Sequence, residues 1–304
     1  MIVRVNRAGL LTTVQDRGRW GYQARGVSVA GPMDLFSHRL ANAIVGNDAD
    51  AATLEVTLTG PHLEFADDRI VAVMGAEFED IPGNTPFPVS SRQPLIFGAR
   101  RSGARAYVAI SGGIDVPVLL GSRATHLPSG MGGFEGRALK AGDGVRLGAF
   151  NAAPPREGRP YGFSRVSGRA TLRVLPGPQT DKFASGALEV LTSQPYQIHP
   201  NSNRVGYRLS GPRLQHALGA DVISDATPIG SVQVPASGEP ILLMADRQTT
   251  GGYAKIATVI AADLSAAGQL APGDEIRFVI CSRAEALEAL RAQERTIAEA
   301  AALP

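Results

Sequence analysis

The sequence is poor in cysteine and has no long apolar run. Cys281 is the only cysteine among 304 residues, which rules out a disulfide within the chain. Its place in the apolar run RFVIC is typical of a small core residue rather than of a nucleophile. The chain has neither a run of about 18 apolar residues nor the apolar centre of a signal peptide near its start, so we predict a cytoplasmic protein.

An excess of charge of one sign is also missing. The formal net charge is +2, which is too small to indicate nucleic acid or a membrane as a partner. Arginine supplies almost all of the basic charge, since Lys140, Lys182 and Lys255 are the only lysines. Lys255 stands out among them because it lies beside a polar loop described below.

The common catalytic signatures are absent as well. The sequence lacks the phosphate-binding pattern G-x-x-x-x-G-K-[ST], the G-x-S-x-G nucleophile turn, the H-E-x-x-H zinc motif and the dinucleotide-binding glycine pattern. The five histidines are scattered without the spacing of metal ligands, so we predict no metal site.

Short apolar runs separated by glycine and proline predict a mainly β protein with a few helices. Between residues 70 and 147 the runs VAVMGA, PLIFGA, RAYVAI and VRLGAF follow one another, which is the pattern of a β-barrel or sandwich. One helix is expected from Asp34, as its N-cap, to Gly46. Another is expected near the C-terminus, where Ser282 and Glu285 form a capping box.

Four landmarks occur twice in the same order, which predicts an internal duplication. The pairs are Gly31-Pro32 with Gly177-Pro178, Gly60-Pro61 with Gly211-Pro212, Pro94 with Pro240 (each 13 positions before a tyrosine), and Gly142-Asp143 with Gly273-Asp274. We therefore predict two tandem, similar β-rich domains, at residues 1–150 and 170–281. Residues 151–169, rich in proline, glycine and arginine, are predicted to be a linker, and residues 282–304 a C-terminal helix.

The stretch at 240–263 carries the most unusual loop. An apolar strand, ILLM, precedes the polar run DRQTTGG, and a second apolar strand follows. Glycine allows a close approach of the backbone to a ligand, and amides and hydroxyls beside an arginine suit an anion. The alternative is a polar hairpin loop that satisfies its own hydrogen bonds.

Several long stretches resemble one family. They are TTVQDRGRWGYQARGVSVAGPMDLFSHRLAN, LEVTLTGPHLEF, ISGGIDVPVLLGSRAT, GGFEGRALKAGD, NRVGYRLSGP and SDATPIGSVQVPASGEPILLMADRQTTGGYAKIATVIAADL, followed by QLAPGDEIRF. Together they resemble the biotin-dependent carboxyltransferase, or allophanate hydrolase subunit 2, family from about residue 5 to about residue 280. The resemblance implies that the two β domains have cyclophilin-like barrel architecture.

The resemblance also implies partners and cofactors. It implies a protein like allophanate hydrolase subunit 1, equivalent to the B subunit of 5-oxoprolinase, and a third protein like the A subunit of that enzyme. 5-Oxoprolinase opens the lactam of 5-oxoproline to L-glutamate with hydrolysis of ATP. The implied cofactor is therefore ATP, either alone or bound with Mg²⁺. None of the three lysines lies in a Met-Lys-Met biotinylation motif, so any biotin would be supplied by another protein.

Both chemistries of this family build negative charge on an oxygen derived from a carbonyl group. Hydrogen-bond donors aimed at that oxygen stabilise it by about 3–4 kcal/mol each. From their residue types we predict that Arg247 and Lys255 serve as donors, and that Asp225 or Asp246 takes a proton or orients a metal-bound nucleotide. These four residues are the predicted catalytic group.

Further polar residues lie in or beside the family-like stretches and are predicted to bind substrate or nucleotide. They are Gln15, Asp16, Arg19, Ser122, Arg123, Asn203, Arg204, Gln233, Thr249, Thr250, Gly251 and Gly252. Each also has a structural interpretation; Arg204, for example, would serve only in a surface salt bridge worth about 0–1 kcal/mol. Asp143 and Asp274 recur at the same turn of both copies, which favours a structural role in an Asx-turn.

Three functions remain open at this level. The first is a subunit of an ATP-dependent 5-oxoprolinase that is inactive alone. The second is one half of a biotin-dependent carboxyltransferase acting on urea or a related amide, which requires a biotin carboxylase and a biotin carrier. The third is a KipA-like regulatory protein that binds and antagonises a kinase inhibitor.

Overall fold

The computed structural model describes residues 1–91, 93–150, 166 and 168–302. It divides into two compact units, each made of segments that are not continuous in the sequence. The first unit comprises Met1–Arg19, Ala30–Arg165 and Gln293–Pro304, and the second comprises Trp20–Val29 and Val166–Ala292. The predicted linker at 151–169 lies almost entirely outside the described residues, so the domain boundaries stay predictions.

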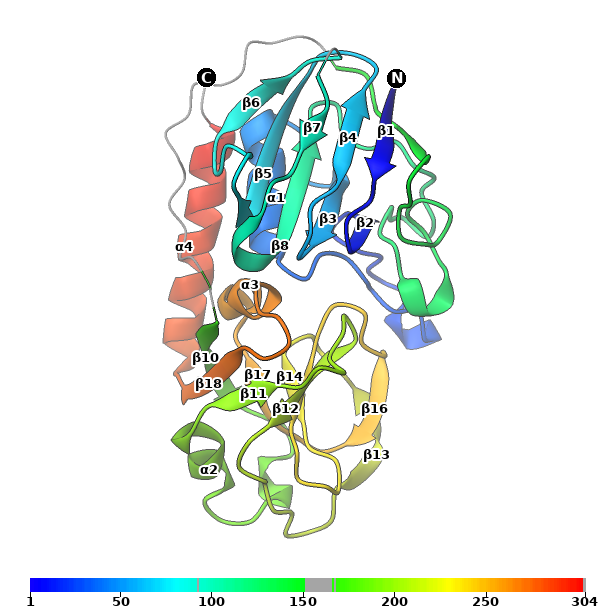
Figure 1. Ribbon diagram of the computed structural model, residues 1–304. Helices are drawn as coiled ribbons and strands as arrows, with labels where there is room; N and C mark the ends of the chain where they lie inside the picture. Colours follow the sequence, from blue (N-terminus) through cyan, green and yellow to red (C-terminus); the bar gives the residue numbers. More distant parts are fainter. Residues whose placement is uncertain (92, 151–165, 167, 303–304) are drawn as a thin grey trace. The chain divides into compact units, whose positions relative to one another are not determined.

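The first unit contains two antiparallel β-sheets packed on one core (Figure 1). The four-stranded sheet has the order β7 (Leu95–Ile96), β4 (His62–Phe65), β1 (Ile2–Arg7) and β9 (Gly144–Arg146). The five-stranded sheet has the order β2 (Leu11–Gln15), β3 (Thr53–Thr57), β8 (Arg100–Ile110), β5 (Arg69–Phe78) and β6 (Pro86–Val89). Val3 and Leu63 of the smaller sheet share this core with Val56 and Val108 of the larger one.

Helix α1 (Leu35–Val45) covers the other face of the five-stranded sheet. Its Leu40 and Ile44 pack on Met74 of β5 and Tyr107 of β8, so these strands are buried on both faces. This explains why VAVMGA and RAYVAI are continuous apolar runs rather than alternating ones. The predicted limits of the helix are confirmed, because the Asp34 carboxylate accepts the Ser37 amide at 2.9 Å and Gly46 ends it in the left-handed region.

His38 is a fully buried histidine on α1. Its Nδ1 lies 2.9 Å from the Thr53 hydroxyl, while its Nε2 is buried without a hydrogen-bond partner among the described residues. Burial disfavours the imidazolium form and lowers the pKa of His38 to about 4, against the opposing attraction of the Asp16 and Glu55 carboxylates. The ring is therefore neutral in the folded chain at neutral pH.

We expect this histidine to make the chain acid-sensitive. Between pH 6.5 and pH 4 the unfolded chain binds a proton that the folded chain does not, so folding stability falls as the pH falls through that window. The loss should approach about 3 kcal/mol at the lower end. The measurement is urea unfolding at pH 7 and at pH 4.5 for the native chain and for His38→Gln, which keeps a polar group near Thr53 but does not titrate. Equal acid losses in the two proteins would contradict this role of His38.

The second unit is built on a closed β-barrel (Figure 1). Its seven strands have the order β10 (Arg169–Pro176), β17 (Lys255–Val259), β14 (Ser231–Gln233), β15 (Ile241–Leu243), β12 (Gly206–Ser210), β11 (Tyr196–Ile198) and β18 (Glu275–Ile280). A parallel pairing of β10 with β18 closes it, with Arg169 opposite Glu275 and Val174 opposite Ile280. Leu172, Val232 and Ile256 are completely buried, as expected for residues that face the interior of a barrel.

Smaller elements complete the second unit. The strands β13 (Asp221–Ala226) and β16 (Thr250–Tyr253) pair with each other in a separate two-stranded ladder. The helices α2 (Ala187–Ser193) and α3 (Leu264–Gly268) are short. The last three residues of the loop predicted at 246–252 therefore belong to strand β16, which begins at Thr250.

The prediction of a mainly β protein is confirmed, with a closed barrel in the second unit. The tandem duplication stays a prediction, because the repeated landmarks match only locally. Asp143 and Asp274 each follow a glycine with positive φ. The carboxylate of each accepts a hydrogen bond from the backbone amide three residues earlier, at 2.8 Å for Asp143 and 2.9 Å for Asp274. The strands that follow differ, since β9 pairs antiparallel with β1 whereas β18 pairs parallel with β10.

The C-terminal helix is α4 (Arg283–Ala301). Its predicted capping box is confirmed, because the Glu285 carboxylate accepts the Ser282 amide at 2.7 Å and the Ser282 hydroxyl accepts the Glu285 amide at 3.2 Å. Among the described helices, α4 included, none is long and apolar enough to cross a membrane.

Candidate functional site

The centre of the candidate site is an ion pair on the second unit between Lys255, the first residue of β17, and Asp225 on β13. The Lys255 Nζ lies 2.7 Å from the Asp225 Oδ2. The lysine side chain is 2% exposed, whereas the aspartate side chain is 48% exposed. The hydrogen bond from Lys255 holds the pKa of Asp225 below its ordinary value, with further help from the Ala226 amide. The pair therefore presents an ionised carboxylate to solvent with an ammonium group beneath it.

Gln179 connects the two partners of this pair. Its Nε2 donates to the Asp225 Oδ2 at 3.2 Å, and its Oε1 accepts the backbone amide of Lys255 at 3.1 Å. The turn that carries it is docked on β17, where the Gly177 amide donates to the Ile256 carbonyl at 2.7 Å. A Cβ on Gly177 would stand 2.3 Å from the Lys255 carbonyl oxygen, so this close approach requires glycine.

Gln233 of β14 places a carboxamide beside the same pair of strands. Its backbone pairs with that of Lys255, and its Oε1 accepts a long hydrogen bond of 3.4 Å from Gln248. Its Nε2 is buried without a hydrogen-bond partner among the described residues. A Cβ on Gly251 would lie 2.7 Å from that nitrogen, so glycine is what lets β16 pass over it. A buried donor without an acceptor is suited to bind an oxygen of a ligand.

Arg247 lies between β15 and β16 and is 8% exposed. Its Nε donates to the Thr227 carbonyl at 2.7 Å and its Nη1 to the Met244 carbonyl at 3.4 Å. Thr227 directly follows β13, and its own amide donates to the Thr249 carbonyl at 3.1 Å. These contacts anchor Arg247 at the end of the β13–β16 ladder where Asp225 pairs with Gly251.

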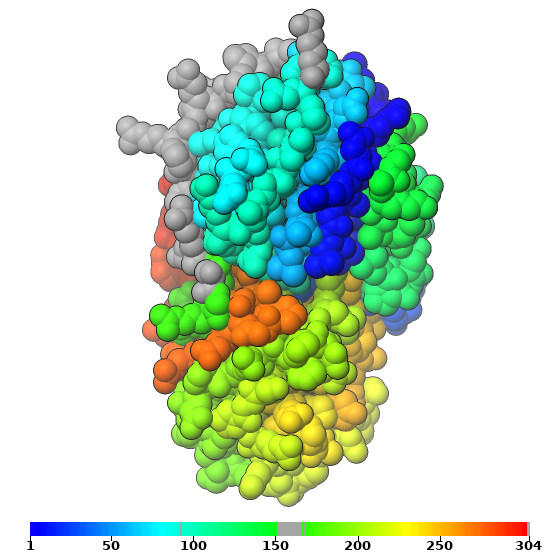
Figure 2. Space-filling view, viewed as in Figure 1, coloured from blue at the N-terminus to red at the C-terminus, as the bar shows by residue number. Residues whose placement is uncertain are grey.

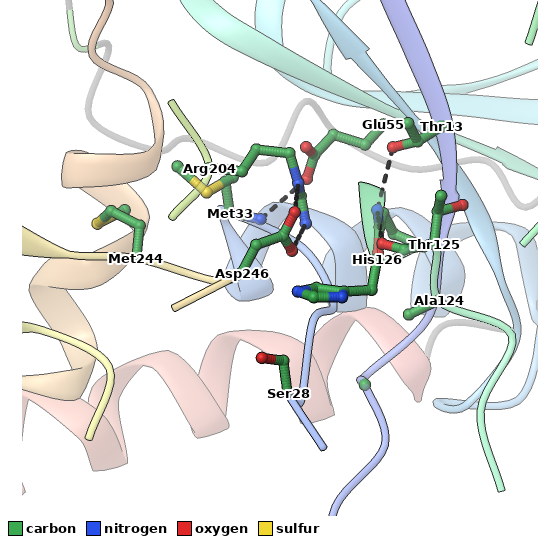
Figure 3. Close-up of polar contacts among 12 residues, drawn as sticks. Thr13, Ser28, Met33, Glu55, Ala124, Thr125, His126, Arg204, Met244 and Asp246 are labelled. Atoms are coloured by element: carbon green, nitrogen blue, oxygen red, sulfur yellow. Dashed lines mark hydrogen bonds and ion pairs between the residues drawn. The ribbon is translucent and has the colours of Figure 1, made fainter. Parts of the chain in front are cut away.

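Asp246, by contrast, is paired with another buried cation (Figure 3). Its two carboxylate oxygens accept Nε and Nη2 of Arg204, both at 2.9 Å, and its amide donates to the Arg204 carbonyl at 2.8 Å. The side chains of Asp246 and Arg204 are 1% and 6% exposed. This bidentate geometry joins two loops of the unit, so Arg204 is not a surface salt-bridge residue and the Asp246 carboxylate is already bonded.

The remaining predicted residues of the second unit have simpler surroundings. Asn203 is exposed, and its side-chain oxygen accepts the Val205 amide at 2.8 Å. Thr250 is exposed and Thr249 is half-buried, and both flank the entry into β16. Gly252 is half-buried and borders no crowded atom, so its backbone is open to approach.

In the first unit the predicted binding residues organise a glycine-rich loop. Asp16 is the hub: its carboxylate accepts the Gly18 amide at 2.9 Å, the Ser122 hydroxyl at 2.6 Å and the Arg123 amide. The Ser122 oxygen in turn accepts the Ala124 amide at 2.9 Å. Figure 2 shows the green surface of this part of the chain beside the dark blue N-terminal strand. Asp16 and Ser122 thus have a structural use that residue type alone did not reveal.

Gln15, the last residue of β2, and Arg19, four residues later, are both completely buried. The Gln15 Nε2 donates to the Thr13 hydroxyl at 3.0 Å and to the Thr125 carbonyl at 3.1 Å. The Arg19 Nη2 donates to the Ala124 carbonyl at 2.5 Å. A Cβ on Gly132 would stand 2.4 Å from that nitrogen, so the loop packs tightly over the guanidinium.

The structure therefore brings together Asp225, Gln233, Arg247, Gly251 and Lys255 in one site, which we call the hairpin site. Sequence reasoning missed two of its parts, Gln179 and Thr227. Gln179 follows the Gly177-Pro178 landmark, which marked a turn but gave no reason to place it against β17. Among the described residues, no group of three or more His, Cys, Asp or Glu side chains is arranged to hold a metal ion.

Fold and site together define a mainly β protein with a cationic polar site beside a glycine-containing strand. Residues 25–280, which are most of the chain, match the sequence profile of the family described as carboxyltransferase domain, subdomains A and B. The chain belongs to this family.

Known relatives agree with this assignment. The C subunit of 5-oxoprolinase from Escherichia coli (strain K12) is 39% identical over 300 residues, which cover 97% of this chain and 96% of that protein. The urea amidolyase of Lachancea kluyveri is 36% identical over 322 residues, covering 96% of this chain but only 18% of that protein. The crystal structure of the K. lactis urea amidolyase superposes with a TM-score of 0.88 at 34% identity, over 98% of this chain and 20% of that one.

Proposed function

We propose that this chain is one subunit of an ATP-dependent 5-oxoprolinase, which opens 5-oxoproline to L-glutamate with hydrolysis of ATP. The observation that carries the proposal is coverage: the chain matches 96% of a protein named as a 5-oxoprolinase subunit, but only 18% of a urea amidolyase. Its partners are then proteins like the A and B subunits of 5-oxoprolinase, and the chain alone is inactive.

The hairpin site supports this chemistry by its donors. Activation of a lactam by phosphorylation of its oxygen, or attack on its carbonyl carbon, builds negative charge on that oxygen. The Lys255 ammonium and the unused Gln233 Nε2 are preorganised donors in a buried setting, where such contacts are strongest. Asp225, kept ionised by Lys255, is placed to accept a proton or to orient a cation.

The residues of the hairpin site suit some groups of an ATP molecule but not all of them. The basic side chain of Lys255 and the open backbone at Gly252 suit phosphate oxygens. Mg²⁺ would depend on the nucleotide for most of its ligands, because Asp225 is the carboxylate that the hairpin site offers. When bound, ATP supplies the phosphoryl group that activates the lactam oxygen.

The test is ATP hydrolysis by this chain copurified with its two partners, the proteins like the A and B subunits, with and without 5-oxoproline. We expect 5-oxoproline to stimulate phosphate release and glutamate to accumulate with it. An intact complex that hydrolyses no more ATP with 5-oxoproline than without it, and forms no glutamate, would refute the proposal.

Carboxyl transfer from biotin is the second candidate. It is favoured by the name of the matching domain and by the close superposition on the urea amidolyase structure. The biotin would come on another protein, together with a biotin carboxylase. Formation of carboxylated urea from bicarbonate and ATP, dependent on this chain and on a biotin carrier, would establish it.

A further inference from the structure

Arg247 of the hairpin site is a buried cation whose hydrogen bonds go to neutral groups. Its Nε and Nη1 donate to the carbonyl oxygens of Thr227 and Met244. A guanidinium group has five N–H donors, so three of them have no acceptor in these two contacts. Burial without a counter-charge lowers the pKa of Arg247 to about 10, with desolvation as the cause.

The carboxylates nearest to Arg247 in the sequence and in the site are already paired. Asp246, its neighbour in the chain, is bonded through both oxygens to Arg204. Asp225, two residues before the Thr227 anchor, is bonded to Lys255 and Gln179. Arg247 forms no ion pair with any of the described residues. A buried cation left unbalanced in this way costs stability, and an anionic ligand would offset that cost.

One edge of the Arg247 guanidinium group is left without a hydrogen-bond acceptor by these two contacts. The Arg247 Nη2 has no hydrogen-bond partner in the described part of the chain, yet it is not among the polar atoms sealed from solvent. The contacts at Nε and Nη1 fix the plane of the guanidinium group and leave the N–H groups of Nη2 available. Planar guanidinium donors of this kind match the geometry of a carboxylate. The anchor at Thr227 places this edge at the end of the β13–β16 ladder that carries Asp225, the partner of Lys255.

We propose that Arg247 binds the carboxylate of the substrate and so selects a lactam that carries an acid group. The inference rests on the proposed function and names the part of the substrate that this residue recognises. 5-Oxoproline has a carboxylate on the ring carbon next to the lactam nitrogen, whereas urea is neutral and offers Arg247 no counter-charge. Arg247 is thereby a specificity residue, and Lys255 and Gln233 address the lactam oxygen.

The experiment compares two lactams in the reconstituted complex: 5-oxoproline, and 2-pyrrolidinone, which has the same ring without the carboxylate. In Arg247→Met we expect kcat/KM for 5-oxoproline to fall about 100-fold, mainly through KM, and kcat/KM for 2-pyrrolidinone to stay within about twofold. Arg247→Lys should keep part of the preference. The matched control is Arg213→Met, because Arg213 is an exposed arginine of the same unit (side chain 72% exposed), and it should change neither value.

Each other outcome would overturn the inference. Equal losses for both lactams would place Arg247 in the chemistry or in folding, and a raised KM for ATP alone would make a phosphate the bound anion. Unchanged kinetics in Arg247→Met would leave the residue without this role. If the native complex shows no turnover with 5-oxoproline, the proposed function fails separately. Calorimetric titration then decides the inference. It requires that 5-oxoproline binds the native complex with measurable heat. It also requires that 2-pyrrolidinone gives much less heat with the native complex, and that 5-oxoproline gives much less heat with the Arg247→Met complex.

Discussion

Replacing Lys255 with methionine should lower turnover of the assembled complex by about 100- to 1,000-fold, the usual effect of removing one preorganised donor to a developing oxyanion. Methionine keeps the length and most of the apolar stem of a side chain that is 2% exposed, so packing changes little. Asp225 loses its ion pair but remains half-exposed and solvated, which limits the cost in stability. We therefore expect a fall in kcat with little change in KM, measured as 5-oxoproline-dependent phosphate release.

Two controls separate this role from a structural one. Gln179→Ala removes a hydrogen bond to Asp225 but leaves the ammonium group in place, so its effect should be smaller than that of Lys255→Met. Thermal unfolding of Lys255→Met should stay close to that of the native chain. Turnover close to the native value in a folded Lys255→Met complex would remove Lys255 from the chemistry and with it the centre of the hairpin site.

The fold was largely predictable where local chemistry decides it. Asp34, Gly46 and the Ser282–Glu285 pair set helix ends through contacts within a few residues, and such contacts can be read from the sequence. The pairing of strands could not be read in this way. The parallel contact of β10 with β18 joins residues that lie far apart in the chain, and nothing in the local sequence of Arg169 points to Glu275.

The candidate site was predictable in composition but not in connection. Residue types and the family resemblance pointed to Arg247, Lys255 and Asp225, yet they did not show which carboxylate pairs with which cation. Asp246 is next to Arg247 in the chain, but its carboxylate reaches Arg204, 42 residues away in the sequence. Gln179 was overlooked for the same reason, since its importance comes only from the docking of its turn on β17.

This pairing leads to the other large effect, which is on stability. We expect Asp246→Ala to lower the free energy of unfolding by about 3–5 kcal/mol, because it removes one member of a buried, bidentate ion pair. The measurement is urea unfolding of the purified chain followed by circular dichroism. Asp225→Ala, which removes a half-exposed carboxylate from the same unit, is the matched comparison and should cost far less.

A double replacement decides whether the Asp246 carboxylate is needed for itself or only for Arg204. In Arg204→Met combined with Asp246→Leu neither charge is buried, so the chain should recover much of the stability that Asp246→Ala loses. If that double variant also supports turnover in the complex, Asp246 serves the fold. If Asp246→Ala is instead as stable as the native chain but inactive, the carboxylate acts in the reaction, as its residue type predicted. The two outcomes differ in both stability and turnover, so one preparation of each variant separates them.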